Sequence, residues 1–126
     1  MNRVVLMGNL TRDPEKVDTK SGADLTTFAI AINSKRTLPS GEQKEEVTFV
    51  NCKCFGKNAI NINKYFHKGR KILIEGKLDQ ERWEKDGVKK SKMVVIAEKF
   101  NFCDSPDKNY NDNNYNNNLP ISYDSI

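Results

Sequence analysis

The chain has 126 residues, a length that suits one domain of ordinary size. Residues 1–103 hold 20 Lys and Arg against 13 Asp and Glu, a net charge of +7, while residues 104–126 carry a net charge of −3. The basic part favours an anionic partner, and the alternative is a lysine-rich surface that serves only solubility. No apolar run reaches the roughly 18 residues that a membrane-spanning helix needs, and no signal-peptide core follows Met1, so we expect a cytoplasmic protein.

The first half of the chain predicts three strand regions. Residues 3–10 alternate apolar side chains and form a first strand, with Gly8 as a predicted bulge or bend. Residues 15–24 are polar and predict a short strand pair or a loop. Residues 25–33 form a second strand, and residues 34–46 read as a long charged loop around Pro39-Ser40-Gly41.

The third strand, residues 47–56, has two faces of different character. Val50, Cys52 and Cys54 alternate on one face and predict a core position. The opposite face carries Phe49 and Phe55 on either side of a lysine, a pattern that suits a flat, anionic, aromatic ligand such as single-stranded nucleic acid. The alternative is a strand covered on both faces, with both phenylalanines in the core.

The cysteines give no sign of a disulfide framework or a metal site. Cys52 and Cys54 share a strand face, and Cys103 lies far along the chain. We expect reduced and mostly buried thiols. His67 is the only histidine, and no ligand pair stands at metal-binding spacing, so neither a metal nor a cofactor is expected.

The second half predicts one short helix and a long hairpin. Residues 57–68 place apolar side chains on one helical stripe, and a glycine follows. Residues 71–83 and 88–102 are long strands joined by a turn at Asp86-Gly87, and Gly76 is a predicted bulge. Five strands with a helix between the third and the fourth predict an all-β, five-stranded OB-fold barrel, a fold that commonly binds oligonucleotides.

The composition changes after residue 103. Seven of residues 109–118 are asparagine, and such a segment buries too little apolar surface to order itself. We therefore predict an OB-fold domain over residues 1–103 and a disordered tail over residues 104–126.

The sequence resembles the bacterial single-stranded DNA-binding protein family from Met1 to about residue 102. The resemblance is carried by Gly8-Asn9-Leu10 followed by Asp13-Pro14-Glu15, and by Ile74-Glu75-Gly76 followed by Leu78. It implies an OB-fold, a homotetramer, cooperative binding and protection of single-stranded DNA in replication, recombination and repair, a nucleoid-associated location, and no catalysis.

The resemblance also implies the binding residues. The aromatic positions on which the family stacks bases match Phe49, Phe55 and Trp83. A fourth family aromatic is replaced here by Lys35 and Arg36. The candidates for phosphate contacts are Arg3, Lys35, Arg36, Lys53, Lys57, Lys71, Lys77, Arg82, Lys85, Lys89 and Lys90.

The chain departs from the family near its C-terminus. Leu119, Pro120 and Ile121 resemble the tip that docks replication and repair proteins, but the acidic residues of that tip are missing. We therefore expect weak docking of such partners.

Two other functions compete with single-stranded DNA binding. An OB-fold RNA-binding module has the same sequence features, and titration with DNA and RNA homopolymers would separate the two. A nuclease would need clustered carboxylates, and Asp79, Glu81 and Glu84 are interleaved with other residues in a way that favours solvated charges.

Overall fold

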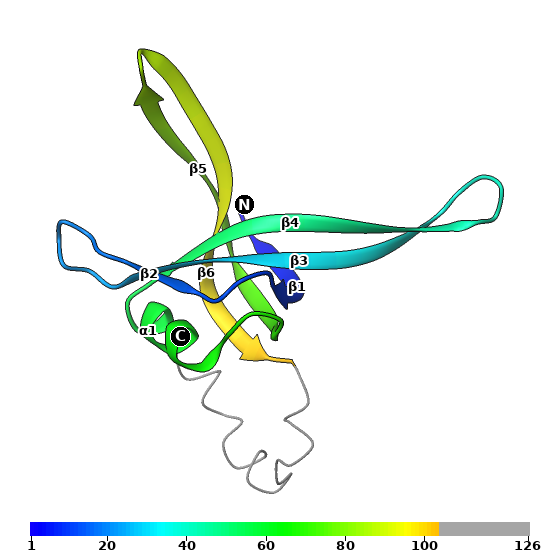
Figure 1. Ribbon diagram of the computed structural model, residues 1–126, viewed down its shortest axis with the longest axis horizontal. Helices are drawn as coiled ribbons and strands as arrows, with labels where there is room; N and C mark the ends of the chain where they lie inside the picture. The colour runs from blue at the N-terminus through cyan, green and yellow to red at the C-terminus, as the bar shows by residue number, and fades with distance from the viewer. Residues whose placement is uncertain (104–126) are drawn as a thin grey trace, which may run out of the picture.

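The computed structural model describes residues 1–103, so the predicted tail and its docking tip lie outside the described residues. The elements in chain order are β1 (Val4–Leu10), β2 (Glu15–Val17), β3 (Leu25–Thr37), β4 (Gln43–Phe55), α1 (Lys57–Tyr65), β5 (Lys71–Lys85) and β6 (Val88–Phe102). Figure 1 shows the strands wrapped around a common centre, with α1 at one end. No helix of this described part is long and apolar enough to cross a membrane.

Five strands close into a barrel in the order β1-β5-β6-β4-β3, because β1 also pairs with β3. The pairings that close the barrel involve few residues. Asn9 and Leu10 of β1 pair with Ala31 and Ile30 of β3, and β4 runs parallel to β6 where Cys52 faces Val95. The remaining neighbours are antiparallel, and β2 lies outside β3. The prediction of a five-stranded OB-fold barrel with one helix between its third and fourth strands is confirmed.

Alternation along each strand places the predicted apolar faces inside the barrel. The most deeply buried side chains are Phe28, Ile30, Cys52, Cys54, Ile62, Ile72, Ile74 and Phe100. At the end where β6 finishes, the rings of Phe66 and Phe102 stack at a centroid distance of 4.8 Å. Cys52 and Cys54 are buried, as their strand face predicted, and Cys103 is partly buried.

Helix α1 covers one end of the barrel with Ala59 and Ile62, which are almost fully buried. The hydroxyl of Thr26 on β3 donates a hydrogen bond of 2.9 Å to the carbonyl oxygen of Ala59, which anchors the helix to the wall. The helix is shorter than the predicted range of residues 57–68, because the backbone at Phe66 is already extended.

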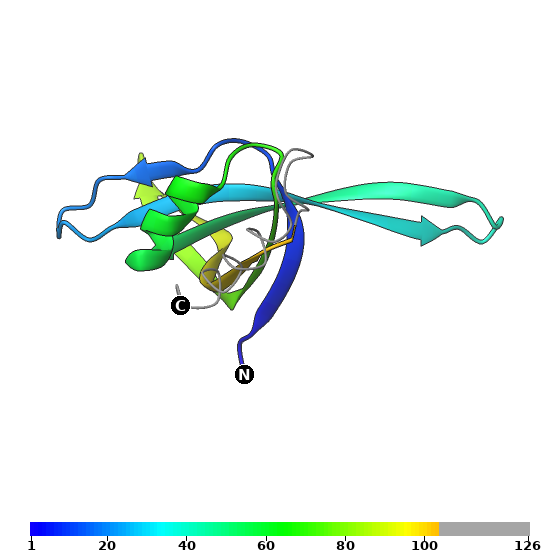
Figure 2. The same ribbon diagram turned by 90° about the horizontal axis from the view of Figure 1, so that it is seen from below.

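The predicted loop over residues 34–46 is wrong for most of its length. Strands β3 and β4 continue past the barrel as a hairpin arm, paired from Asn33 and Val47 out to Thr37 and Gln43. Figures 1 and 2 show this arm extending away from the barrel on the side opposite α1. Arg36 and Glu46 form an exposed ion pair across the strands, at 3.2 Å.

The predictions for the turn and for one of two glycines hold. Asp86 and Gly87 both have positive φ angles, 54° and 79°, as a tight hairpin turn requires. Strands β5 and β6 change register at Gly76, which confirms the bulge. Gly8 is different: β1 pairs with β5 through it without a shift, and a Cβ there would lie 2.6 Å from the carbonyl oxygen of Ala31. Gly8 therefore permits a close approach of two strands rather than a bulge.

Candidate functional site

Three large aromatic side chains lie at the surface of the single chain. Phe49 is 71% exposed, Phe55 46% and Trp83 42%. The alternative in which both phenylalanines belong to the barrel core is therefore wrong. Exposure of such large rings leaves much apolar area in water, which is unusual unless the area meets a ligand or a partner.

The three rings project from one side of the molecule. Phe49, Lys53 and Phe55 alternate on the outward face of β4, whose other face carries the buried Cys52 and Cys54. On β5, Glu81 and Trp83 share a face because they are two residues apart. Lys53 Nζ lies 2.6 Å from Glu81 Oε2, and this ion pair places the outward faces of β4 and β5 together.

Lys53 is the most buried cation on this face. Its side chain is 17% exposed, and its ammonium group lies 5.7 Å from the centroid of the Phe55 ring, within the range of a cation–π interaction. Lys92 on β6 contacts the same carboxylate at 3.6 Å. The hydrogen bond from Lys53 is the main cause that lowers the pKa of Glu81 below its ordinary value.

A shallow groove of about 460 Å³ begins at Phe55 and crosses β5 and β6. Its lining residues are Lys53, Phe55, Asn58, Lys77, Asp79, Ile96, Ala97 and Glu98. The side-chain amide of Asn58 donates a hydrogen bond of 2.9 Å to the carbonyl oxygen of Glu98, which ties α1 to β6 at the edge of the groove. The groove thus offers one ring and two ammonium groups, and two carboxylates, Asp79 and Glu98, also line it.

The other predicted cations are spread over the molecule. Lys35 and Arg36 lie on the β3–β4 arm, Lys57 begins α1 two residues after Phe55, and Lys85, Lys89 and Lys90 lie near the tip of the β5–β6 hairpin.

Two other predicted cations point away from the face that carries the rings. Arg3 is paired with Glu75 at 3.1 Å on the outer wall formed by β1 and β5, and Arg82 alternates to the opposite face of β5 from Trp83, where it donates to Gln80. Lys71 is the first residue of β5, opposite Asn9.

Sequence reasoning missed Lys92 and Asn58. Lys92 stands two residues from Lys90 on β6, so strand alternation alone could have placed it on the same face. Asn58 carried no such signal, because its position depends on how α1 docks against β6.

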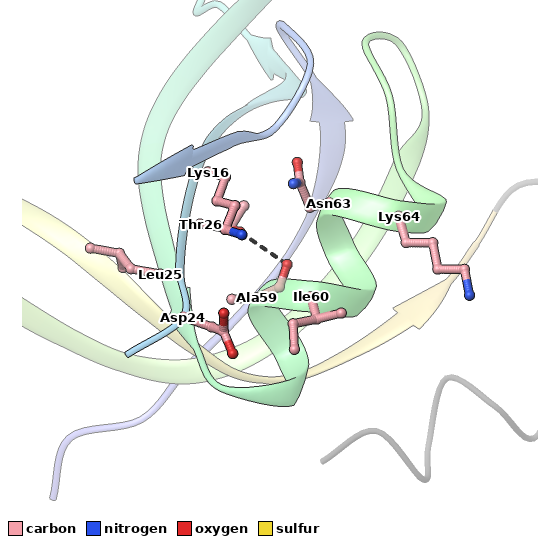
Figure 3. Close-up of a pocket in the computed structure, with 8 residues that line it drawn as sticks. All are labelled: Lys16, Asp24, Leu25, Thr26, Ala59, Ile60, Asn63 and Lys64. Atoms are coloured by element: carbon pink, nitrogen blue, oxygen red, sulfur yellow. Dashed lines mark hydrogen bonds between the residues drawn. The ribbon is translucent and has the colours of Figure 1, made fainter. Parts of the chain in front are cut away.

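A second, smaller hollow of about 170 Å³ lies between α1 and the β2–β3 region. Figure 3 shows Lys16 and Asp24 across from Ile60 and Asn63 of the helix, and Lys64 of the same helix also lines the hollow. None of the three exposed rings lines this hollow, so it is separate from the groove at Phe55.

Carboxylates and other potential metal ligands are not gathered anywhere in residues 1–103: no group of three or more His, Cys, Asp or Glu side chains is placed to hold a metal ion. Of the three carboxylates considered for a nuclease, Glu81 is paired with lysines, and Glu84 alternates to the other face of β5.

The sequence is similar to known proteins over the whole described part of the chain. A family model described as the single-strand binding protein family matches residues 1–103. A protein of Helicobacter hepaticus named single-stranded DNA-binding protein is 42% identical over 117 residues, which cover 92% of this chain and 68% of that protein. The protein of the same name from Wolinella succinogenes is 42% identical over 125 residues, covering 98% of this chain and 76% of the relative.

Solved structures are similar in fold. The single-stranded DNA-binding protein of Thermus aquaticus, in a deletion mutant, superposes with a TM-score of 0.75 at 31% identity and covers 84% of this chain and 52% of its own. A Plasmodium falciparum protein, solved in complex with single-stranded DNA, also gives a TM-score of 0.75, at 23% identity, with 82% of this chain and 96% of that chain covered. The latter likeness is one of fold alone.

Proposed function

The chain belongs to the single-strand binding protein family, and from this premise we propose that it binds and protects single-stranded DNA with little dependence on base sequence. The observation that carries the proposal is the shared face of β4 and β5, where Phe49, Phe55 and Trp83 are exposed beside lysines. Single-stranded nucleic acid offers what such a face can bind, namely a π-face on every base and a charge on every phosphate.

The proposed role of the rings is stacking. Each of Phe49, Phe55 and Trp83 would stack one base, and each stack contributes roughly 1–3 kcal/mol whatever the base. Phe49 lies at the root of the β3–β4 arm, Phe55 at the groove, and Trp83 on the β5–β6 hairpin. A strand that reaches all three passes from one projecting arm, across the barrel wall, to the other (Figure 1).

The proposed role of the cations is neutralisation of phosphates. Lys77 in the groove, Lys57 beside it, and Lys85 and Lys90 near the tip of the β5–β6 hairpin are exposed and follow the path of the rings. Lys89 stands opposite Glu84 and therefore lies on the other face of the hairpin, with Arg82. Each phosphate that they neutralise should lower the logarithm of the binding constant by about 0.7 per tenfold increase in salt. Arg3 and Arg82, which lie away from this face, are the weakest of the predicted contacts.

The edge of β1 supports self-association. Only Asn9 and Leu10 of this strand pair with β3, which leaves much of one edge without a strand partner within residues 1–103. Val5 and Met7 on its outer face are 54% and 52% exposed. Edges of this kind favour pairing with a second copy, and we propose a homotetramer, as is typical of the family.

The family also suggests the wider role. We infer a non-catalytic protein that coats single-stranded DNA during replication, recombination and repair, in the cytoplasm at the nucleoid. Recruitment of replication and repair proteins through Leu119, Pro120 and Ile121 remains a prediction about residues outside the described part.

Titration of the single tryptophan, Trp83, tests the proposed function directly. Oligo-dT should quench Trp83 fluorescence as a base stacks on the indole, and sedimentation of the same samples should report both the subunit number and the complex. A parallel titration with oligo-U is the control. No binding of oligo-dT by the folded protein, or tighter binding of the RNA, would contradict the proposal.

A further inference from the structure

The face proposed to bind DNA contains a carboxylate that already holds two of its lysines. Glu81 Oε2 lies 2.6 Å from Lys53 Nζ on β4, and Glu81 Oε1 lies 3.6 Å from Lys92 Nζ on β6. One oxygen therefore contacts a lysine of the adjacent strand β6, and the other contacts a lysine of β4, the strand beyond it. The side chain of Glu81 is 31% exposed, so solvent and a bound polyanion can both reach this cluster.

Glu81 lies on the path between two of the rings. It precedes Trp83 by two residues on β5, and Lys53 precedes Phe55 by two residues on β4, so each partner of the ion pair shares a strand face with a ring. Asp79, two residues before Glu81, lines the groove at Phe55. A DNA strand that runs from Phe55 to Trp83 must pass the Glu81 carboxylate.

An ammonium group held by a carboxylate differs from a free one in its response to DNA. While it stays with the carboxylate it neutralises no phosphate, so the cation condensed at that phosphate is not released. To bind the phosphate it must also leave Glu81, whose charge would then face the polyanion with less compensation. The lowered pKa of Glu81, caused first by the hydrogen bond from Lys53, keeps this charge in place at neutral pH.

We propose that Glu81 is an internal counterion of the DNA-binding face, which occupies Lys53 and Lys92 and so lowers both the affinity for single-stranded DNA and its salt dependence. This inference rests on the proposed function and concerns how tightly the protein binds single-stranded DNA. It removes Lys53 from the set of lysines available to phosphates in the unaltered protein and assigns it to the ring of Phe55 and to Glu81.

The first experiment compares Glu81→Gln with Glu84→Gln in the full chain. Both variants remove one negative charge from β5, but Glu84 alternates to the opposite face. Binding of fluorescently labelled oligo-dT is followed by anisotropy over a series of salt concentrations. For Glu81→Gln we expect tighter binding and a salt slope steeper by about 0.7 for each lysine released, up to about 1.4, whereas Glu84→Gln should leave the slope close to that of the unaltered protein.

A second variant tests whether Lys53 contributes to the steeper salt slope. Adding Lys53→Gln to Glu81→Gln should remove about 0.7 of the added slope, because one released ammonium group is then missing. Thermal unfolding of each variant confirms that the comparison is made on folded protein.

Different results would contradict the counterion role of Glu81 and the proposed DNA binding. Equal slopes for Glu81→Gln and Glu84→Gln, or an added slope that Lys53→Gln does not reduce, would overturn the counterion role while leaving DNA binding intact. Failure of the unaltered protein to bind oligo-dT would instead overturn the proposed function.

Discussion

The α-carbon of Gly76 on β5 lies against the backbone of Ile96 on β6, so closely that a Cβ at Gly76 would stand 1.8 Å from the carbonyl oxygen of Ile96. The register shift between β5 and β6 occurs at this residue. A methyl group here meets backbone on the neighbouring strand, which cannot rotate away as a side chain can. We expect Gly76→Ala to lower the free energy of unfolding by about 3 kcal/mol or more, measured by urea denaturation.

Gly22→Ala is the matched control for this prediction. Gly22, unlike Gly76, has a positive φ, 78°, and nothing lies within 4 Å of its hypothetical Cβ. Gly22→Ala should lower the free energy of unfolding by about 1–2 kcal/mol, the cost of holding alanine in the left-handed backbone conformation. A loss at Gly76 no larger than that at Gly22 would show that the strands relax around the added methyl group and that the contact with Ile96 costs little.

The barrel could be predicted from sequence because its strands have strong local signals. Alternation placed Phe28 and Ile30 on one face and separated Cys52 and Cys54 from Phe49 and Phe55, since one face of each strand meets a dry core. The turn at Asp86-Gly87 needs two positive φ angles, for which Asp-Gly is well suited. The residues that make up each of these signals lie close together in the sequence.

What the sequence did not reveal depends on contacts between distant residues. The β3–β4 arm is a strand ladder that runs out to Thr37 and Gln43, and a strand with two polar faces shows no apolar alternation. The role of Gly8 depends on the approach of Ala31. Lys53 was predicted as a phosphate contact, yet its partner Glu81 lies 28 residues away on another strand, where only the fold brings the two together.

Replacing Phe49 should affect binding without affecting folding. The ring is 71% exposed, so little of its area is buried when the chain folds. If it stacks on a base, Phe49→Ala should weaken binding of oligo-dT by roughly 1–3 kcal/mol, while the urea midpoint stays near that of the unaltered protein. Anisotropy titration and urea denaturation of the same samples measure the two effects.

Phe28→Ala provides the opposite case. Phe28 is fully buried in the barrel, and its truncation should cost about 3–5 kcal/mol of stability. A loss of stability at Phe49 comparable to that at Phe28 would mean that the Phe49 ring is part of a packed interface rather than a stacking platform.

The buried thiols predict a loss of stability at alkaline pH. Burial raises the pKa of Cys52 and of Cys54 from 9.0 to about 12. Between these values the unfolded chain releases protons that the folded chain retains, so the free energy of unfolding falls as pH rises. At about one pH unit above the ordinary value, each thiol should contribute a loss of about 1.4 kcal/mol.

Urea denaturation of the unaltered protein and of the Cys52→Ala Cys54→Ala variant at a series of alkaline pH values checks this prediction. The variant is less stable at every pH because of the lost packing, but its stability should decline less steeply. Parallel curves for the two proteins would show that the buried thiols do not cause the decline.

The hydroxyl of Thr26 should matter more than its shape suggests, because it is the hydrogen-bond donor that joins β3 to α1. Thr26 is 1% exposed, and its hydroxyl lies 2.9 Å from the carbonyl oxygen of Ala59, as Figure 3 shows beside the hollow under the helix. Thr26→Val keeps the volume but leaves that carbonyl without this donor, at a cost of about 1–3 kcal/mol. Urea denaturation should detect the loss, and hydrogen exchange should locate it in α1.

Thr48→Val is the control, because Thr48 is at an exposed position of β4. It should change stability by no more than about 0.5 kcal/mol. An equal effect at Thr26 and Thr48 would show that the hydrogen bond to Ala59 does not anchor the helix.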